Sequence, residues 1–360
     1  MKTQGIRYSG SKKEILPSII DMIKNLDIKT TLDGFSGSTR VAQALKQSGY
    51  DVDSNDISIY SYIFGNCYLV NNKPKEYFSD KINYLNNLDG YEGWFTKSYG
   101  GVVTKNIKGN AVQDDGKKRP WQKHNTMKLD SIRNEIDKIS ENEIEKSVLL
   151  TSLIMAMDKV DNGLGHQVSY LKDWSPRSYL NMKLEIPELL IGSGNYKSRC
   201  EDIFNIKDEY DLIYLDPPYG TNNLKTRTTR VRYASYYHLW TTIVKNDEPN
   251  LFGASIRRED VSSDTKPGAI SVFEHLNYEL VKNSIYNLIN NLNSKYFLFS
   301  YNNKSKIKIE DLVSIFSKDF NLIETRYFKH KENVQKSLTS NKEWLGDTGE
   351  NLEYLFLIEK

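Results

Sequence analysis

Residues Asp211 to Gly220 read DLIYLDPPYG, and this stretch decides the expected fold. Four apolar residues run straight into Asp216, and the two prolines after it cannot continue a strand ladder. An unbroken apolar run is typical of a strand covered on both faces, as in a parallel α/β sheet, where ligands bind outside the carboxyl ends of the strands. We therefore expect Asp216 at the rim of a cleft.

The residues after this strand hold a carboxylate, a carbonyl and an aromatic ring in fixed relative positions. Pro217 fixes its own φ and favours extended geometry at Asp216, and Pro218 does the same for Pro217. With the ring of Tyr219 beside them, the two oxygen acceptors suit a flat heterocycle that carries an exocyclic amine. A Pro-Pro turn with a surface tyrosine is the structural alternative.

Composition limits the possible classes. The 360 residues allow one large α/β domain with an insertion, or two modest domains. A net charge of +2 excludes a wholly basic protein, although 24 tyrosines fit a local nucleic-acid surface. The two cysteines and five histidines lack disulfide or metal-ligand spacing, which predicts a reduced, cytoplasmic setting without a metal. Since no apolar run reaches the length of a membrane span, we expect no membrane contact.

An earlier segment has the layout of a nucleotide-binding unit. A short strand ends at Asp33, a glycine turn follows over residues 34–39, and a helix is expected over 40–46. The turn does not match GxGxxG, so a dinucleotide site is poorly supported. It also misses the nucleophile motif GxSxG, because position 38 is Ser38 rather than glycine. Asp56, at the end of the next strand, is a candidate ligand for ribose hydroxyls, with a solvated aspartate as the alternative.

The N-terminal residues predict a loop that leads into a helix. The sequence GIRYSGSKK contains two glycines, and Ser11 with Glu14 resembles a capping box before the apolar stripe of residues 15–23. Free N–H groups at a helix start, together with Lys12, suit a carboxylate ligand. A loop that only caps a core helix is the structural alternative.

The middle of the chain lacks the alternation of strands and helices. From Asn71 to about Leu190 there are amphipathic helices but no clear βα units, and such a length far exceeds an ordinary connection. We therefore expect an inserted, mainly helical domain over residues 73–190. The two parts of the catalytic domain would cover residues 1–72 and 191–360.

Two regions carry an excess of positive charge. Residues 97–128 hold eight Lys/Arg against two acids, with aromatic residues interleaved, and residues 220–231 hold no acid. Such segments fit phosphate contact, and solvated charged loops are the structural alternative. The candidate DNA-binding residues are Lys117, Lys118, Arg119, Lys172, Lys225, Arg227, Arg230 and Arg232.

Taken in order, these motifs resemble the Dam-type class (class D12) of N6-adenine DNA methyltransferases over nearly the whole chain. YSGSK at residues 8–12 is similar to the family's N-terminal cofactor motif, residues 33–37 to its glycine motif, and residues 216–219 to its catalytic motif. The segments LDSIR (129–133) and SYLKDW (169–174) also look like the branch that accompanies type IIS restriction nucleases.

The resemblance implies a Rossmann-like sheet with helices on both faces and an inserted target-recognition domain. It implies transfer of a methyl group from S-adenosyl-L-methionine (AdoMet) to N6 of an adenine flipped out of duplex DNA, which leaves S-adenosyl-L-homocysteine (AdoHcy). A restriction-modification system with a separately encoded endonuclease would be the setting. The implied catalytic residues are Asp216, Pro217, Pro218 and Tyr219. The implied cofactor-binding residues are Tyr8, Gly10, Lys12, Asp33, Phe35, Ser36, Gly37, Asp56, Asp202 and Asp216.

Several other functions remain open from the sequence. Cytosine N4 or guanine N2 of ribosomal RNA are chemically close acceptors, whereas cytosine C5 chemistry needs a Pro-Cys nucleophile and neither cysteine follows a proline. From other classes come an α/β hydrolase built on Ser36 and a DNA-binding protein without catalysis. The methyltransferase hypothesis requires that Asp216 share one hollow with Asp33 and Asp56.

Overall fold

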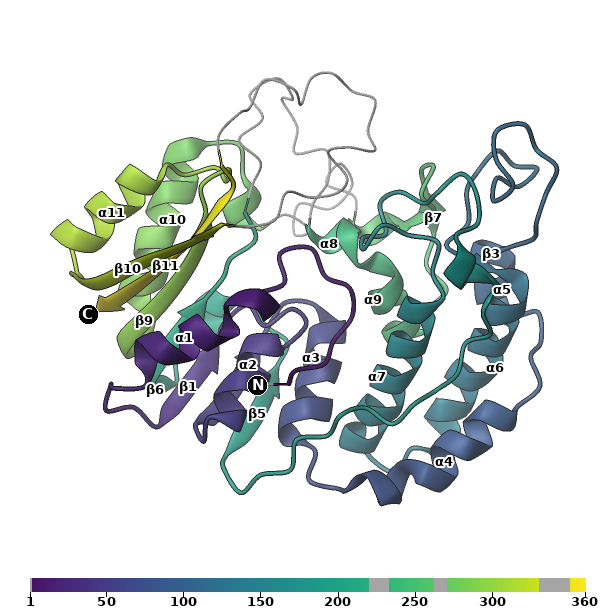
Figure 1. Ribbon diagram of the computed structural model, residues 1–360, viewed down its shortest axis with the longest axis horizontal. Coiled ribbons are helices and arrows are strands. Elements are labelled where there is room, and N and C mark those ends of the chain that lie inside the picture. Colours follow the sequence, from purple (N-terminus) through teal and green to yellow (C-terminus); the bar gives the residue numbers. More distant parts are fainter. Residues whose placement is uncertain (1, 220–232, 262–270, 330–349) are drawn as a thin grey trace.

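The computed structural model describes residues 2–219, 233–261, 271–329 and 350–360, and its centre is a sheet with the strand order β10-β11-β9-β6-β1-β2-β5 (Figure 1). β11 runs antiparallel to both β9 and β10, and the pairings from β9 through β6, β1 and β2 to β5 are all parallel. The strands are β1 (Thr30–Asp33), β2 (Asp51–Asn55), β5 (Tyr196–Arg199), β6 (Glu209–Leu215), β9 (Asn293–Asn302), β10 (Asn321–Lys329) and β11 (Leu352–Glu359).

The order of these strands creates a switch point between β1 and β6. From β1 the chain proceeds to β2 and β5 on one side, whereas β6 leads to β9 on the other. In open α/β sheets, ligands bind where the order reverses, outside the carboxyl ends of the strands. The predicted catalytic turn begins at this point, because Asp216 directly follows β6.

Helices cover both faces of the sheet, as predicted. α1 (Leu16–Ile23) and α2 (Arg40–Gln47) pack on the face that carries Leu212 and Tyr214, and α10 (Tyr278–Asn291) and α11 (Ile309–Lys318) pack on the face that carries Ile213 and Leu215. Side chains alternate between the faces of a strand, so the unbroken apolar run in β6 supplies both cores. The α/β fold class predicted from that run is therefore confirmed.

The remaining helices form a second body beside the sheet (Figure 1). Its core joins Ile132 and Leu153 of the predicted insertion to Phe64 and Trp240, which come from outside it. The elements are α3 (Ile59–Gly65), a π-helical turn (Asn66–Val70), α4 (Lys75–Asn87), α5 (Trp94–Tyr99), β3 (Gly100–Gly101), β4 (Trp121–Gln122), α6 (Lys123–Ile139), α7 (Glu143–Lys159), α8 (Tyr233–Tyr236), α9 (His238–Lys245), β7 (Leu251–Phe252) and β8 (Arg257–Arg258). None of the helices in the described ranges is long and apolar enough to cross a membrane.

The predicted capping box near the N-terminus is wrong. Residues Lys13–Ile15 form a 3₁₀ turn, and α1 begins only at Leu16, with Pro17 in its first turn and no side-chain cap. Lys12 lies just before the turn and is only 6% exposed. The loop is therefore shaped by the burial of an ammonium group inside the molecule.

Candidate active site

One cavity of about 1070 Å³ opens beside the carboxyl ends of β1, β2 and β6. It brings together segments that are far apart in the chain, since Tyr8, Asp33, Asp56 and Asp216 all line it. The shared hollow that the methyltransferase hypothesis requires is therefore present. The predicted residues in its lining are Tyr8, Gly10, Lys12, Asp33, Phe35, Ser36, Gly37, Asp56, Asp202, Asp216, Pro217, Pro218 and Tyr219.

A single ammonium group joins the predicted catalytic turn to the N-terminal loop. The Nζ atom of Lys12 lies 2.8 Å from Oδ2 of Asp216 and donates to the hydroxyl of Tyr219 at 3.0 Å. That hydroxyl in turn donates to Oδ1 of Asp216. Since charge-assisted hydrogen bonds are strong in a buried setting, both oxygens of the Asp216 carboxylate are held in place.

Glu353, at the start of β11, completes this cluster and was missed by the sequence analysis. Its Oε1 atom lies 3.2 Å from Nζ of Lys12 and 2.8 Å from the hydroxyl oxygen of Tyr219, so it competes with Asp216 for the single proton of that hydroxyl. The same atom accepts a hydrogen bond from the hydroxyl of Ser300 at 2.7 Å. Its Oε2 atom accepts from the Asn302 amide at 3.2 Å. The only sequence signal was an acid within the apolar strand LEYLFLIE, which resembles ordinary edge patterning. Together Lys12, Asp216, Tyr219 and Glu353 form one charged cluster.

Burial and pairing act in opposite directions on the ionisable groups of the charged cluster. Burial raises the pKa of Asp216, although Lys12 acts against the rise. Burial disfavours the charged forms of Lys12 and Glu353 as well, but the two carboxylates raise the pKa of Lys12 above its usual value. Lys12 and the hydroxyl and amide donors likewise lower the pKa of Glu353. The pKa directions of Lys12 and Glu353 thus favour their charged forms, whereas the direction for Asp216 favours its neutral form.

Asp33 ends β1 and its carboxylate meets the start of α2. Oδ2 accepts a hydrogen bond from the backbone N–H of Ala42 at 3.0 Å, whereas Oδ1 is buried without a hydrogen-bond partner in the described structure. Burial raises the pKa of Asp33 to about 8, and the nearby charges of Asp216 and Asp56 contribute. A buried acceptor without a partner is costly, so this atom is suited to a ligand that brings a donor.

The glycine turn is shaped by Gly37 and Asp56. Gly37 has φ +48°, and a Cβ atom there would lie 2.5 Å from the hydroxyl of Tyr8, so only glycine fits between the two loops. The Asp56 carboxylate accepts from the N–H of Gly37 at 2.9 Å and from that of Ser58 at 2.8 Å. The end of β2 therefore fixes the turn after β1. Burial raises the pKa of Asp56.

Two groups of apolar side chains flank the acids in the cavity. On one side Tyr8 stacks on Tyr237 with ring centroids 4.5 Å apart, and Tyr233 meets both rings edge-on. On the other side Phe204 stacks on Phe273 at 6.0 Å, beside Asp202. The lining also includes Ile57, which is 69% exposed. The cavity thus offers flat apolar surfaces at two places.

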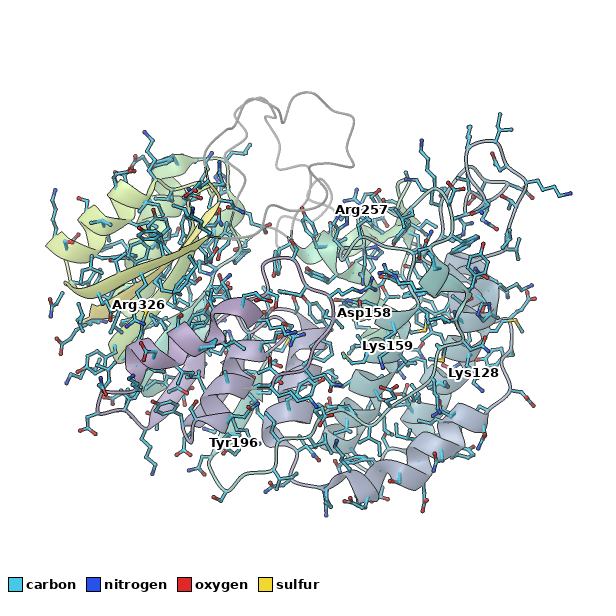
Figure 2. The ribbon with its side chains drawn as sticks, in the orientation of Figure 1. Lys128, Asp158, Lys159, Tyr196, Arg257 and Arg326 are labelled. Carbon is cyan, nitrogen blue, oxygen red and sulfur yellow. The ribbon has the colours of Figure 1, made fainter. Side chains whose placement is uncertain are left out.

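The N-terminal loop is anchored on the helical body by charge. The guanidinium of Arg7 lies 3.2 Å from a carboxylate oxygen of Asp158 and 2.8 Å from one of Asp161, at the end of α7. Figure 2 shows Asp158 on α7 beside this loop. Because Tyr8 follows Arg7 directly and Lys12 lies five residues after it, the helical body helps to position the predicted cofactor motif.

The predicted basic residues fall into three groups. Lys118 and Arg119 have partners inside the protein: Lys118 donates to the carbonyl of Tyr170 at 2.8 Å, and Arg119 pairs with Asp115 at 2.8 Å. Lys117 is partly exposed and Lys172 is exposed. Lys225, Arg227, Arg230 and Arg232 lie outside the described residues.

The serine proposed for a hydrolase has a different environment. The Oγ atom of Ser36 lies 2.9 Å from Oγ of Ser61. The described lining of the cavity contains no histidine that could act as its base. Among the described residues, no group of three or more His, Cys, Asp or Glu could hold a metal ion.

Comparison with known proteins decides the family. A sequence profile described as "D12 class N6 adenine-specific DNA methyltransferase" matches residues 8–315. The chain belongs to this family. The expected resemblance is thereby confirmed, and family membership implies AdoMet as the cofactor.

Relatives of this chain carry names of modification enzymes. It is 29% identical to the modification methylase StsI of Streptococcus sanguinis over 94% of the chain and 50% of that protein. It is 27% identical to the type II methyltransferase M.FokI of Planomicrobium okeanokoites, over 99% of the chain and 53% of the relative. The chain thus spans about half the length of these two proteins. The type II methyltransferase M.NlaIII of Neisseria lactamica matches at 24% identity over 99% of both chains.

Proposed function

We propose that this chain transfers a methyl group from AdoMet to N6 of an adenine that is flipped out of duplex DNA. The observation that carries the proposal is the meeting of Asp216 with Asp33 and Asp56 in one cavity at the switch point of the sheet. The family profile, which is described as adenine-specific, supports adenine over cytosine or guanine as the target base.

The residues present fit AdoMet. Its α-amino group and ribose hydroxyls are hydrogen-bond donors, and the cavity offers acceptors: the unpartnered Oδ1 of Asp33 and the carboxylate of Asp56. Asp202, with the apolar surfaces of Ile57 and Phe204, would hold the adenine ring of the cofactor. When bound, AdoMet supplies an electrophilic methyl group on a positively charged sulfur.

The catalytic turn supplies positioning and electrostatics. The lone pair of an adenine amino group is delocalised into the ring and is a poor nucleophile. Asp216 and the carbonyl of Pro217 would accept the two N–H bonds, which favours a pyramidal nitrogen whose lone pair points toward the methyl group. The ring of Tyr219 would stack on the flipped base. No covalent nucleophile is needed, because orientation and pre-placed charge lower the barrier.

Duplex DNA would be held mainly by exposed lysines of the predicted insertion. Lys97, Lys105, Lys108 and Lys172 are exposed, and Lys117 is partly exposed. We infer that they contact phosphates, whereas Lys118 and Arg119 shape the loops through their internal partners. The names of the relatives, a modification methylase and a type II methyltransferase, support a role in a restriction-modification system, and we infer a separately encoded endonuclease from that setting.

The proposal is tested by transfer of a labelled methyl group from AdoMet. The purified protein is incubated with genomic duplex DNA, with an adenine-free G·C duplex and with ribosomal RNA. We expect incorporation into the genomic DNA alone. Incorporation into the adenine-free duplex would establish cytosine N4 or guanine chemistry, and incorporation into RNA alone would contradict a DNA substrate. AdoMet binding without transfer to any of them would support a DNA-binding protein without catalysis.

A further inference from the structure

The charged cluster contains one more carboxylate than its lysine requires. An ammonium group has three hydrogen-bond donors. The Nζ atom of Lys12 already has the carboxylate of Asp216 at 2.8 Å, the hydroxyl of Tyr219 at 3.0 Å and the carbonyl of Gly10 at 3.1 Å. Glu353 adds a fourth acceptor at 3.2 Å. Its presence is therefore not explained by the need to satisfy Lys12.

The second carboxylate changes the net charge of the site. With Lys12, Asp216 and Glu353 ionised, the charged cluster carries one net negative charge, whereas Lys12 and Asp216 alone would be neutral. Glu353 is 3% exposed, so burying its charge costs free energy. Buried ion pairs often contribute little net stability, so stability alone does not explain why a carboxylate stands here. Glu353 also lies beyond residues 8–315, the part that the family profile covers.

We propose that Glu353 is a positioning residue which, by holding Lys12 and Tyr219, keeps a net negative charge beside Asp216 and thereby favours positive charge on the methyl-accepting amine. This inference rests on the proposed function and deepens it. Glu353 need not touch the substrate, because its contacts run through Lys12 and through the Tyr219 hydroxyl at 2.8 Å.

The movement of positive charge during methyl transfer explains how the charge of Glu353 would assist the reaction. The N6–CH3 bond forms as the S–CH3 bond breaks, and the electron pair of the broken bond stays on sulfur. One positive charge thus moves from sulfur to N6, and N6 then loses one proton to the Asp216 carboxylate and from there to solvent. A fixed negative charge near Asp216 stabilises the cationic nitrogen, in the way that preorganised charges stabilise other transition states.

Binding of two ligands that differ in charge at sulfur separates this role from a structural one. AdoMet carries the positive charge and AdoHcy does not. Glu353→Gln removes the charge with little change of shape. We expect it to weaken the affinity for AdoMet by roughly five- to tenfold, while the affinity for AdoHcy changes by less than about twofold. Titration calorimetry on the purified full chain measures both constants. Equal losses for the two ligands, or no loss for either, would overturn the proposal.

The pH dependence of single-turnover methyl transfer is a second test of the role of Glu353. The groups that face Asp216 are Lys12 from the N-terminal loop, Glu353 from β11, Asp33 from β1, Tyr214 from β6, Tyr233 from α8 and Tyr219 of its own turn. Since Glu353 raises the pKa of Asp216, its neutralisation moves the acid limb of the profile to lower pH. The plateau rate should fall by about ten- to a hundredfold. A slower rate with an unmoved acid limb would indicate a merely structural role and overturn the proposal.

Two further variants control for folding. Glu350→Gln makes the same chemical change on an exposed glutamate that pairs with Lys329 outside the cavity, and it should leave rate, ligand preference and acid limb unchanged. Glu353→Asp keeps the charge, so the ratio of AdoMet to AdoHcy affinity should stay within about twofold of the wild type even if Glu353→Gln does not fold. A larger change of that ratio would contradict the proposal. If the wild-type protein methylates no adenine, the proposed function fails, yet the ligand ratio still tests the role of Glu353.

Discussion

The cavity at the switch point and the helical body beside it differ in how directly the sequence specifies them. Residues predicted for the cofactor and catalysis come from five separate segments, and all of them line one cavity. Of the described basic residues predicted for DNA, Lys118 and Arg119 instead have partners inside the protein. The carboxyl ends of parallel strands meet because of topology, whereas a charged side chain on a loop finds its partner only in three dimensions.

The largest effect is expected at the edge of the cavity. Asp216→Ala removes the acceptor that we assign to the target amine and leaves Lys12 buried beside Glu353 alone. We expect single-turnover transfer to fall by at least about 10²- to 10³-fold, with AdoMet affinity changed far less. Asp114→Ala, in an exposed loop of the predicted insertion, is the control and should retain full transfer. Near-normal turnover of Asp216→Ala would refute the role of this carboxylate.

The second effect concerns the independence of the helical body. Leu153 on α7 is fully buried, in a core that also contains Phe64 of α3. We expect Leu153→Ala to lower the free energy of unfolding by about 2–5 kcal/mol. Because α3 follows Asp56 closely, AdoMet binding and tryptophan fluorescence should be lost at the same urea concentration. The exposed Leu180→Ala should change stability by less than about 0.5 kcal/mol. AdoMet binding that outlasts the unfolding of the helices would show that they fold separately.

A third effect follows from the raised pKa of Asp33. With a pKa of about 8, Asp33 is protonated in the free protein at pH 6.5. A ligand ammonium favours the ionised carboxylate, so AdoMet binding at that pH should release about one proton, and affinity should rise with pH toward 8. Calorimetry in two buffers of different ionisation enthalpy counts this proton. Asp33→Asn should release none, and a wild-type protein that releases none would contradict the assignment.

The smallest effect is expected at the exposed loop of the predicted insertion. Lys105 and Lys108 are exposed between β3 and β4. Replacing both by alanine should weaken DNA binding and reduce the slope of log affinity against log salt by about one to two, because each phosphate contact contributes about 0.9. Lys138→Ala, at the other end of α6, should leave the slope unchanged. An unchanged slope for the double variant would exclude these lysines from the DNA surface.

What could be predicted from the sequence depended on local constraints. The apolar run before Asp216 fixed a strand with two covered faces, and the glycine turn after Asp33 fixed the neighbouring unit. Glu353 could not be predicted, because it reaches the site from β11, an antiparallel strand about 135 residues after Asp216 in the chain, and only the three-dimensional pairing of β11 with β9 brings it there. The capping box at Ser11 failed for a similar reason, since the burial of Lys12 against distant carboxylates shapes that loop.

We propose above all that the cavity at the ends of β1, β2 and β6 delivers a methyl group to an exocyclic amine of adenine. The most direct measurement is to digest the labelled DNA product to nucleosides and to identify the methylated one by mass spectrometry. We predict N6-methyldeoxyadenosine as the labelled nucleoside from the wild-type protein and its absence with Asp216→Ala. Label in N4-methyldeoxycytidine, or equal labelling by the two proteins, would contradict the account.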